Sequence, residues 1–307
     1  MELPRVHELL RIIRPEMTLA SNRSPVSYSD VFFGEWEMDK MQHFMEHTHL
    51  PISIAITTAY LLMVKFGPQM MANCKAPDLQ HALVAWNLAL CAYSGISFCL
   101  LLPYIMQSYY KGGIIGTLCY NDDFYTNPVS GYVAWLFAMS KGPELIDTVF
   151  LIVRKRPVIF MHWYHHSVTF LAGQIFFTEF VPWARYVIIE NLFVHTIIYF
   201  ALRAFGVKTP LWIPKAITCI QNGSLQITQF ASAFYLAGHM FYFHLTEGLD
   251  NCNNKVDRMW MGCGVLATYI YLFAEYFHNA YIKKQSPTKR KATIDTSAEA
   301  SDAKKLE

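Results

Sequence analysis

Long apolar segments separated by short polar stretches dominate the chain from Leu50 onward. Seven of them approach the roughly 20 residues that a helix needs to cross the hydrocarbon core of a membrane. The predicted helices cover about Leu50–Phe66, Leu83–Met106, Ser130–Val153, Val158–Phe177, Ala184–Leu202, Ile213–Phe234 and Trp260–Ile282. Pro103 interrupts the second, and polar residues weaken the third, fifth and sixth. The pattern therefore predicts an all-α integral membrane protein with about seven transmembrane helices.

Composition strengthens this prediction. The 307 residues are 53% hydrophobic and 16% charged, whereas a soluble domain carries about 25% charged residues. We expect a lumenal amino-terminal segment over residues 1–48, a seven-helix membrane domain over 49–282 and a disordered, solvated tail over 283–307. No cleavable signal peptide is expected, because the residues before the first apolar segment are polar and of mixed charge.

The basic residues of the short loops predict the orientation. They fall on one side of the membrane: Arg154, Lys155, Arg156, Arg203, Lys208, Lys215, Lys283 and Lys284. That side should be cytosolic, so the amino terminus is lumenal and the carboxyl terminus cytosolic. Asn22 then begins a glycosylation sequon on the lumenal side, and Lys304 and Lys305 form a cytosolic dilysine retrieval signal. Each motif alone arises by chance, but both agree with the loop charges and indicate the endoplasmic reticulum membrane.

The seven cysteines show no CxxC pair and no zinc spacing, which makes a metal or redox site built from cysteine improbable. Cys119 and Cys252 fall in predicted lumenal loops, where an oxidising compartment permits a disulfide. Two free thiols fit the sequence equally well, because a sequence does not give the Cα–Cα distance that a disulfide needs.

Ionisable residues inside the third predicted helix are the first candidates for chemistry. Lys141, Glu144 and Thr148 fall on one helical stripe, and Asp147 lies beside it. The opposite charges can compensate each other's desolvation. A structural ion pair that fixes helix packing is the alternative interpretation.

The second candidate is His162-Trp163-Tyr164-His165-His166, at the start of the fourth predicted helix. Spacings of three and four residues place these histidines on one side of a helix. Such a group suits metal binding, or proton transfer and nucleophilic chemistry near neutral pH.

Further polar residues on the next two helices fit an interior site. Asn191 and His195 are one helical turn apart and can face the same interior. Gln226 and Gln229 are candidate amide donors, although glutamines in a bundle also serve as simple interhelical contacts.

Two other functions compete for these residues. A di-iron desaturase or hydroxylase needs about eight histidines in HxxxH and HxxHH boxes, and this chain has one HxxHH. His43 and His47 spell HxxxH, but they precede the first apolar segment on the predicted lumenal side. A non-enzymatic lipid transporter would use the polar groups of the third helix as its path, yet no internal inverted repeat is visible.

Taken in order, the motifs resemble the very-long-chain fatty acid elongase family. The matching residues are Lys141-x-x-Glu144-x-x-Asp147-Thr148, His162-x-x-His165-His166 and Asn191-x-x-Val194-His195. The His-Trp-Tyr-His-His form is similar to the subgroup that acts on saturated and monounsaturated chains. Ile198-Tyr199-Phe200-Ala201 departs from the usual Met-Tyr-x-Tyr-Tyr run, which bears on tunnel shape and chain length rather than on the chemistry.

The resemblance implies six helices around an acyl tunnel that is closed toward the lumen. It also implies the condensation of a long-chain acyl-CoA with malonyl-CoA, giving 3-oxoacyl-CoA, CO2 and CoA, as in a very-long-chain 3-oxoacyl-CoA synthase. Both CoA esters are substrates, and no metal or redox cofactor is required. Expected partners are the membrane lipids, the other enzymes of the elongation cycle (ketoacyl reductase, dehydratase and enoyl reductase) and a second copy of the chain, with no nucleic acid.

The roles of single residues follow as hypotheses. His165 would be the nucleophile that forms an acyl-imidazole, while His162, His166 and His195 orient it, move protons or bind the thioester. Asn191 would stabilise an enolate oxygen. Residues expected to bind substrate are Lys141, Glu144, Asp147, Thr148, Asn191, Gln226, Gln229, Arg154 and Lys155. The last two would meet CoA phosphates, although the positive-inside rule explains them equally well.

Overall fold

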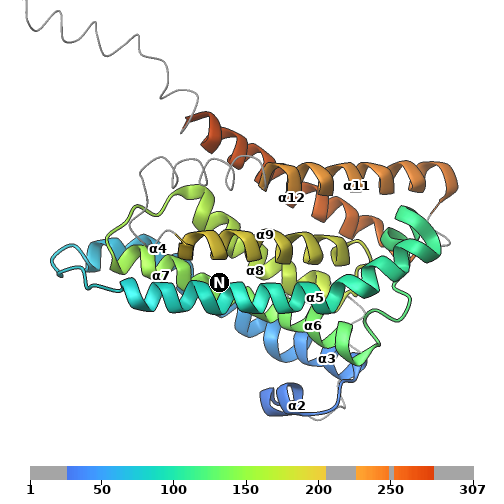
Figure 1. Cartoon of the computed structure of the whole chain (residues 1–307), viewed down its shortest axis with the longest axis horizontal. Coiled ribbons are helices and arrows are strands. Elements are labelled where there is room, and N and C mark those ends of the chain that lie inside the picture. Colours follow the sequence, from blue (N-terminus) through green and yellow to red (C-terminus); the bar gives the residue numbers. More distant parts are fainter. Residues whose placement is uncertain (1–25, 205–225, 249–251, 280–307) are drawn as a thin grey trace, which may run out of the picture.

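The computed structural model describes residues 26–204, 226–248 and 252–279, and all regular structure within these ranges is helical. Figure 1 shows the long helices running roughly along one direction. The elements are α2 (Tyr28–Phe33), α3 (Met38–Phe44), η2 (Met45–His49), α4 (Leu50–Met70), α5 (Gln80–Cys119), α6 (Pro128–Ser140), η3 (Pro143–Leu145), α7 (Ile146–Val153), α8 (Phe160–Thr178), α9 (Ala184–Ala204), α11 (Gln226–Glu247) and α12 (Val256–Phe277). The predicted all-α class is confirmed.

Two helical stretches of the described residues are long and apolar enough on their own to cross a membrane, Met38–Met70 and Gln80–Cys119. The first begins upstream of the predicted start at Leu50, because α3 and the π turn η2 run into α4 without interruption. Pro51 follows the π turn. A proline breaks the α-helical hydrogen-bond ladder, and a π turn is one way in which a helix absorbs such a break.

Helix α5 is also longer than its apolar pattern predicted. It continues past Pro103 and Met106 to Cys119, with a kink at Gly113, whose φ is +62°. Glycine adopts this left-handed conformation without the steric cost that a Cβ brings. Helix α5 packs along α9 over much of its length.

The third predicted helix is broken in the structure into α6, the short 3-10 turn η3 and α7. Asn127 caps the start of α6 by accepting hydrogen bonds from the backbone N–H groups of Val129 and Ser130. The break follows Gly142, at Pro143, which has no N–H to donate and whose ring clashes with the carbonyl four residues earlier. Lys141 and Glu144 therefore lie at a turn within the bundle rather than on one continuous helix.

The fourth and fifth predicted helices agree closely with α8 and α9, and the sixth continues past its predicted end at Phe234. Helix α11 covers Gln226–Glu247, and residues 213–225 lie outside the described part of the chain. His239 and His244 lie on this helix. Helix α12 begins at Val256, upstream of the predicted start at Trp260.

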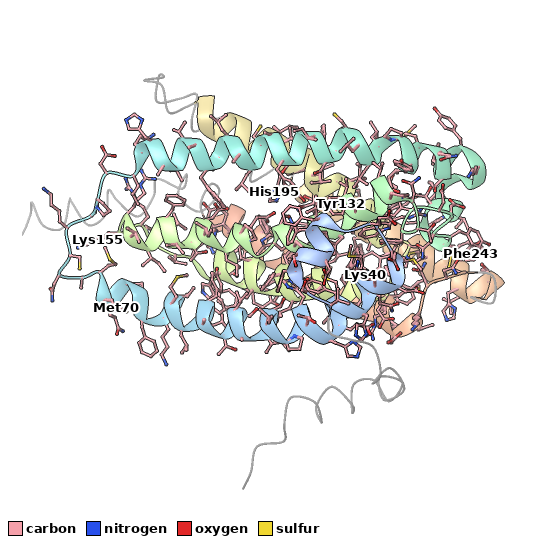
Figure 2. The ribbon with its side chains drawn as sticks, turned by 90° about the horizontal axis from the view of Figure 1, so that it is seen from below. Lys40, Met70, Tyr132, Lys155, His195 and Phe243 are labelled. Carbon is pink, nitrogen blue, oxygen red and sulfur yellow. A yellow bond between two sulfur atoms is a disulfide. The ribbon has the colours of Figure 1, made fainter. Side chains whose placement is uncertain are left out.

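The hydrophobic core lies between the packed helices. Its largest cluster joins α3, α5, α6 and α9 through Phe44, Leu101, Trp135 and Leu192. Close packing of these large side chains fixes the helix positions. Lys155 and Met70 lie at one end of the bundle, here called the Lys155 end, and Phe243 lies toward the other (Figure 2).

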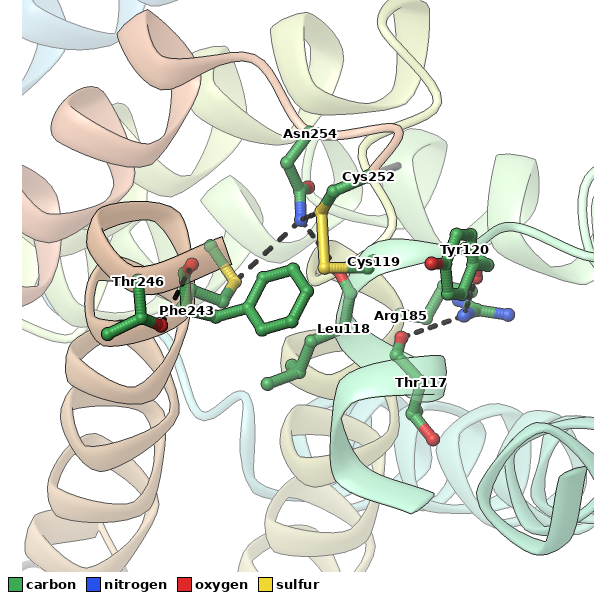
Figure 3. The surroundings of a disulfide bond; sticks show 10 residues. Thr117, Leu118, Cys119, Tyr120, Arg185, Phe243, Thr246, Cys252 and Asn254 are labelled. Atoms are coloured by element: carbon green, nitrogen blue, oxygen red, sulfur yellow. Dashed lines mark hydrogen bonds between the residues drawn. A yellow bond between two sulfur atoms is a disulfide. The ribbon is translucent and has the colours of Figure 1, made fainter. Parts of the chain in front are cut away.

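The opposite end, here called the disulfide end, is held by a covalent bond and by buried polar contacts. Cys119 and Cys252 form a disulfide with a Cα–Cα distance of 4.6 Å (Figure 3). The Asn254 amide donates to the Leu118 carbonyl at 2.6 Å. Together these contacts join the end of α5 to the segment that leads into α12.

Arg185 at the start of α9 is fully buried at the same end. Its guanidinium donates to the carbonyls of Thr117, at 2.7 Å, and of Tyr120, both at the end of α5 (Figure 3). The last carbonyls of a helix lack intrahelical partners and carry the negative end of its dipole. A cation placed there stabilises the end of α5 and attaches it to α9.

Candidate functional site

The three clustered histidines lie on the first two turns of α8, nearer the Lys155 end than the disulfide end. The ring centroids of His162 and His166 are 4.4 Å apart, and those of His165 and His166 are 5.5 Å apart. All three side chains are half-buried. The structure therefore brings them together on one side of the helix, as their spacing predicts.

A chain of hydroxyl groups orients His162. Its Nε2 atom lies 2.9 Å from Thr148 Oγ1 on α7, and Thr148 Oγ1 lies 2.8 Å from the Tyr60 hydroxyl on α4. Thr148 is fully buried. Three helices thus fix the position of one imidazole ring, and the Thr148 hydroxyl is engaged by both His162 and Tyr60.

Lys141 joins the helix break to α9. Its Nζ atom lies 2.7 Å from Glu144 Oε1 and 2.9 Å from Asn191 Oδ1. Lys141 and Glu144 are only 3% and 6% exposed, so each compensates the other's desolvation. The ammonium group also lies 4.2 Å from the centroid of the Phe137 ring, which adds a cation–π contact.

The hydrogen bond from Lys141 determines how the Asn191 amide is oriented. An ammonium group can only donate hydrogen bonds, so the oxygen of Asn191 must face Lys141. The amide NH2 group is then directed away from Lys141. Asn191 lines a cavity between the helices, where its NH2 group can serve as a donor.

His195 lies one turn beyond Asn191 on α9, in the middle of the molecule (Figure 2). It interacts electrostatically with Glu144 and Lys141, as does His165 of α8. The ion pair therefore lies among histidines from two helices. Side chains from the turn after α6, from α8 and from α9 thus lie around one ion pair.

The cavity that Asn191 lines, here called the main cavity, has a volume of about 110 Å³ and lies between α6, α8, α9, α11 and α12. Its polar end is formed by His165, Asn191 and Gln229. From there it follows α8 to Phe177 and ends near Trp183, among apolar side chains. Helices α4 and α5 supply none of its lining residues, and α5 packs against α9. A polar head with a long apolar interior suits a ligand with one reactive end and a hydrocarbon tail.

Three predicted substrate-binding residues lie away from this centre. Asp147 accepts a hydrogen bond from Trp86 Nε1 of α5 at 2.7 Å, so it contacts α5. Arg154 ends α7, and Lys155 donates to the Ala72 carbonyl at 2.9 Å in the α4–α5 connection. The side chain of Gln226 lies outside the described residues, as do Asn22, Lys304 and Lys305.

Sequence reasoning missed several aromatic residues that contact the predicted site residues. Tyr60 and Trp86 bond to Thr148 and Asp147, and Tyr269 of α12 has its ring centroid 4.9 Å from that of His165. The Tyr269 hydroxyl is paired with Thr169 Oγ1 at 2.7 Å. Each lies in an apolar segment remote in sequence from its partner, so no local pattern marked it.

Within the described ranges, no group of three or more histidine, cysteine or carboxylate side chains is arranged to hold a metal ion. His43 and His47 stack on each other with centroids 4.3 Å apart, in the helix that leads into α4. The expectation that the reaction needs no cofactor stays a prediction.

Comparison with known proteins identifies the fold and the general activity. The model of the GNS1/SUR4 family, also named ELO, matches residues 44–289. The chain belongs to this family. It is 38% identical over 275 residues to "Long chain fatty acid elongase 2" of Caenorhabditis elegans, covering 89% of this chain and 98% of that protein. It is 30% identical over 260 residues to "Very long chain fatty acid elongase 3" of Homo sapiens, covering 84% and 93%.

Membership of the ELO family confirms the resemblance drawn from the motifs. ELO proteins are integral membrane proteins, so the helices of this chain form a membrane-embedded bundle. The chain is therefore a membrane enzyme of fatty acid elongation and lipid metabolism.

Proposed function

We propose that this ELO protein is the condensing enzyme of the elongation cycle, joining a long-chain acyl-CoA to malonyl-CoA by way of an acyl-imidazole on His165. The observation that carries the proposal is the position of His165. It lies at the polar end of the main cavity, beside Asn191 and Gln229. An acyl tail in this cavity would place its thioester at the imidazole.

The length of the cavity matches that of a long acyl chain. It follows α8 from His165 to Phe177, a stretch of about 18 Å at ~1.5 Å per residue. Its walls beyond the polar end are almost entirely apolar. Burial of the hydrocarbon tail would supply the binding free energy that holds the thioester in place.

In the first step, the unprotonated ring nitrogen of His165 attacks the thioester carbonyl. The C–N bond forms and the C–S bond breaks. CoA leaves as a thiolate and takes up the proton that the acylated imidazolium loses. A covalent intermediate divides the condensation into two easier steps. In this proposal His162, held by Thr148, and His166 keep this ring oriented and carry the proton.

In the second step, malonyl-CoA loses CO2, and the electron pair of the broken C–C bond forms an enolate. Its carbon attacks the acyl group, the new C–C bond forms, and the C–N bond to His165 breaks. The departing His165 ring takes up one proton from water, which restores the neutral imidazole and balances the reaction. The NH2 group of Asn191 donates to the enolate oxygen, because its own oxygen is engaged by Lys141. The products are 3-oxoacyl-CoA, CO2 and CoA.

The CoA groups would bind at the Lys155 end, which we assign to the cytosol. Arg154 and Lys155 end α7 there, close along the chain to α8 and its histidines, and guanidinium and ammonium groups pair well with phosphates. The disulfide end would be lumenal, in keeping with the oxidising conditions that a disulfide needs.

The cellular membrane and the partners of the enzyme are part of the same proposal. We place it in the endoplasmic reticulum membrane, with Asn22 glycosylated and Lys304 and Lys305 read as a retrieval signal. Its partners would be the other enzymes of the cycle and a second copy of the chain. Metal and redox cofactors have no part in the proposed steps.

Acyl transfer can be tested without malonyl-CoA. Purified protein incubated with palmitoyl-CoA alone should release free CoA and carry one acyl group on the peptide that contains His165, as seen by mass spectrometry. His165→Ala should do neither, and His239→Ala, on α11 outside the main cavity, should behave as wild type. Acylation of a different residue, with His165→Ala unimpaired, would contradict the assignment.

A further inference from the structure

A second, smaller cavity lies next to the main cavity, between α9, α11 and α12. It has a volume of about 20 Å³. Trp183, Val187, Ala233, Gly262 and Leu266 line both cavities and so form the wall between them. The second cavity continues to Met240, Met259 and Leu118 near the disulfide end, away from the histidines.

Trp183 is the largest side chain in that wall, and Gly262 sets its position. A Cβ atom at Gly262 would lie 2.5 Å from two carbons of the indole ring, closer than side chains approach each other. The Phe176 ring packs on Trp183 with centroids 4.9 Å apart. Because Gly262 has no side chain, the Trp183 indole ring can lie between the two cavities.

Packing, rather than hydrogen bonding, holds the indole ring. Trp183 is 9% exposed, and within the described residues its Nε1 atom is buried with no hydrogen-bond partner. A buried donor without an acceptor carries a desolvation cost. The ring is nevertheless kept between Gly262 and Phe176, which is consistent with a steric role at this position.

We propose that Trp183, seated on Gly262, is the partition that limits acyl chain length in this enzyme, and that the second cavity is space for a longer chain once the partition is removed. The proposal rests on the acyl-binding role given to the main cavity. The methyl end of the preferred acyl group would then lie against the indole ring.

The partition should strongly affect the specificity of the enzyme for acyl chain length. One methylene more or less in an apolar pocket changes specificity by roughly 10-fold to 200-fold. Without the indole ring, the two cavities join, and a chain longer by one elongation unit can extend toward Met240 and Met259. With a methyl group at position 262, the indole ring must shift. We expect it to move into the main cavity, which leaves less space for the acyl chain.

Product lengths test the partition. Each variant is given acyl-CoA esters of increasing length with malonyl-CoA, and products are measured by mass spectrometry. We expect Trp183→Ala, and less strongly Trp183→Leu, to raise the ratio of longer to shorter products by roughly 10-fold or more. Gly262→Ala should lower that ratio, because the displaced ring encroaches on the main cavity.

Two matched variants control for the substitutions themselves. Gly264→Ala changes a glycine of the same helix with nothing within 4 Å of the added Cβ. Trp260→Ala removes a tryptophan that is 64% exposed. Both should leave the product profile unchanged. An unchanged profile in folded, active Trp183→Ala and Trp183→Leu would overturn the proposal.

A second readout does not depend on catalysis. Cys263 is a free cysteine that lines the second cavity, and its reaction with N-ethylmaleimide can be followed on its own peptide by mass spectrometry. A long acyl-CoA should slow this reaction several-fold in Trp183→Ala and not in wild type. If wild type lacks condensation but this protection is seen, the proposed reaction fails and the partition stands. If condensation is normal and protection is absent, the partition fails.

Discussion

The Lys141 ammonium group lies 2.9 Å from Asn191 Oδ1 while it is also paired with Glu144 at 2.7 Å. This contact connects a charge at the helix break to a residue of the cavity wall. Since the ammonium group only donates, it fixes the Asn191 oxygen and leaves the amide NH2 group to act as a donor. Besides its contribution to packing, the ion pair therefore orients the Asn191 amide.

Removing the Asn191 donor should slow condensation without unfolding the protein. Asn191→Asp keeps an oxygen for Lys141 but has no N–H, so it cannot donate to the enolate oxygen. Loss of one such donor typically lowers kcat about 10²-fold to 10³-fold. We expect this fall with little change in KM for the acyl-CoA, measured as steady-state 3-oxoacyl-CoA formation. A folded Asn191→Asp variant with the wild-type rate would remove the enolate role.

Breaking the buried ion pair should destabilise the bundle. Lys141→Met leaves the Glu144 carboxylate buried without its partner, which typically costs about 3–5 kcal/mol. The double variant Lys141→Met with Glu144→Leu should recover much of that loss, because no unpaired charge remains. Thermal unfolding in detergent measures the coupling between the two residues as a double-mutant cycle. Strictly additive effects of the two single variants would show that the pair is not coupled.

Thr148 should act through the position of His162. Thr148→Val preserves the shape of the side chain but leaves both the Tyr60 hydroxyl and His162 Nε2 without this partner, at a cost of about 1–3 kcal/mol. We expect a fall in kcat with a smaller change in KM. Thr148→Ser should restore activity, since it retains the hydroxyl. Equal activity of the Val and Ser variants would leave only a packing role for this residue.

Loss of the disulfide should weaken the disulfide end. The bond joins residues separated by 133 positions, and removal of a native disulfide commonly costs about 2–5 kcal/mol. Cys119→Ser with Cys252→Ser should therefore unfold at a lower temperature, and mass spectrometry should detect no cross-linked peptide. Cys99→Ser, which changes an exposed free cysteine, is the control. Two alkylatable thiols at these positions in the native protein would refute the bond.

Much of this fold was predictable because apolar stretches that cross a membrane are long and distinctive. Helices α8 and α9 fall nearly where the sequence places them. The errors occur where local chemistry competes with hydrophobicity. Pro143 divides the third helix, and the apolar pattern underestimates α5, whose later turns carry polar residues such as Ser108 and Lys111.

The site was predictable to the extent that its residues are unusual within a membrane. Three histidines on two turns and a buried Lys141–Glu144 pair attract attention because charges and imidazoles are costly there. Tyr60 and Trp86 gave no such signal, since aromatic residues are common in apolar helices. Their roles depend on contacts with Thr148 and Asp147, which arise only when the helices pack.

Release of CO2 tests the central claim most directly. Purified protein in detergent receives palmitoyl-CoA and malonyl-CoA labelled at its free carboxyl group, without NADPH or added metal. The account predicts labelled CO2 that requires both substrates and is lost in a folded His165→Ala variant. Absence of label release across a panel of acyl-CoA lengths with folded protein, or full release by His165→Ala, would contradict it.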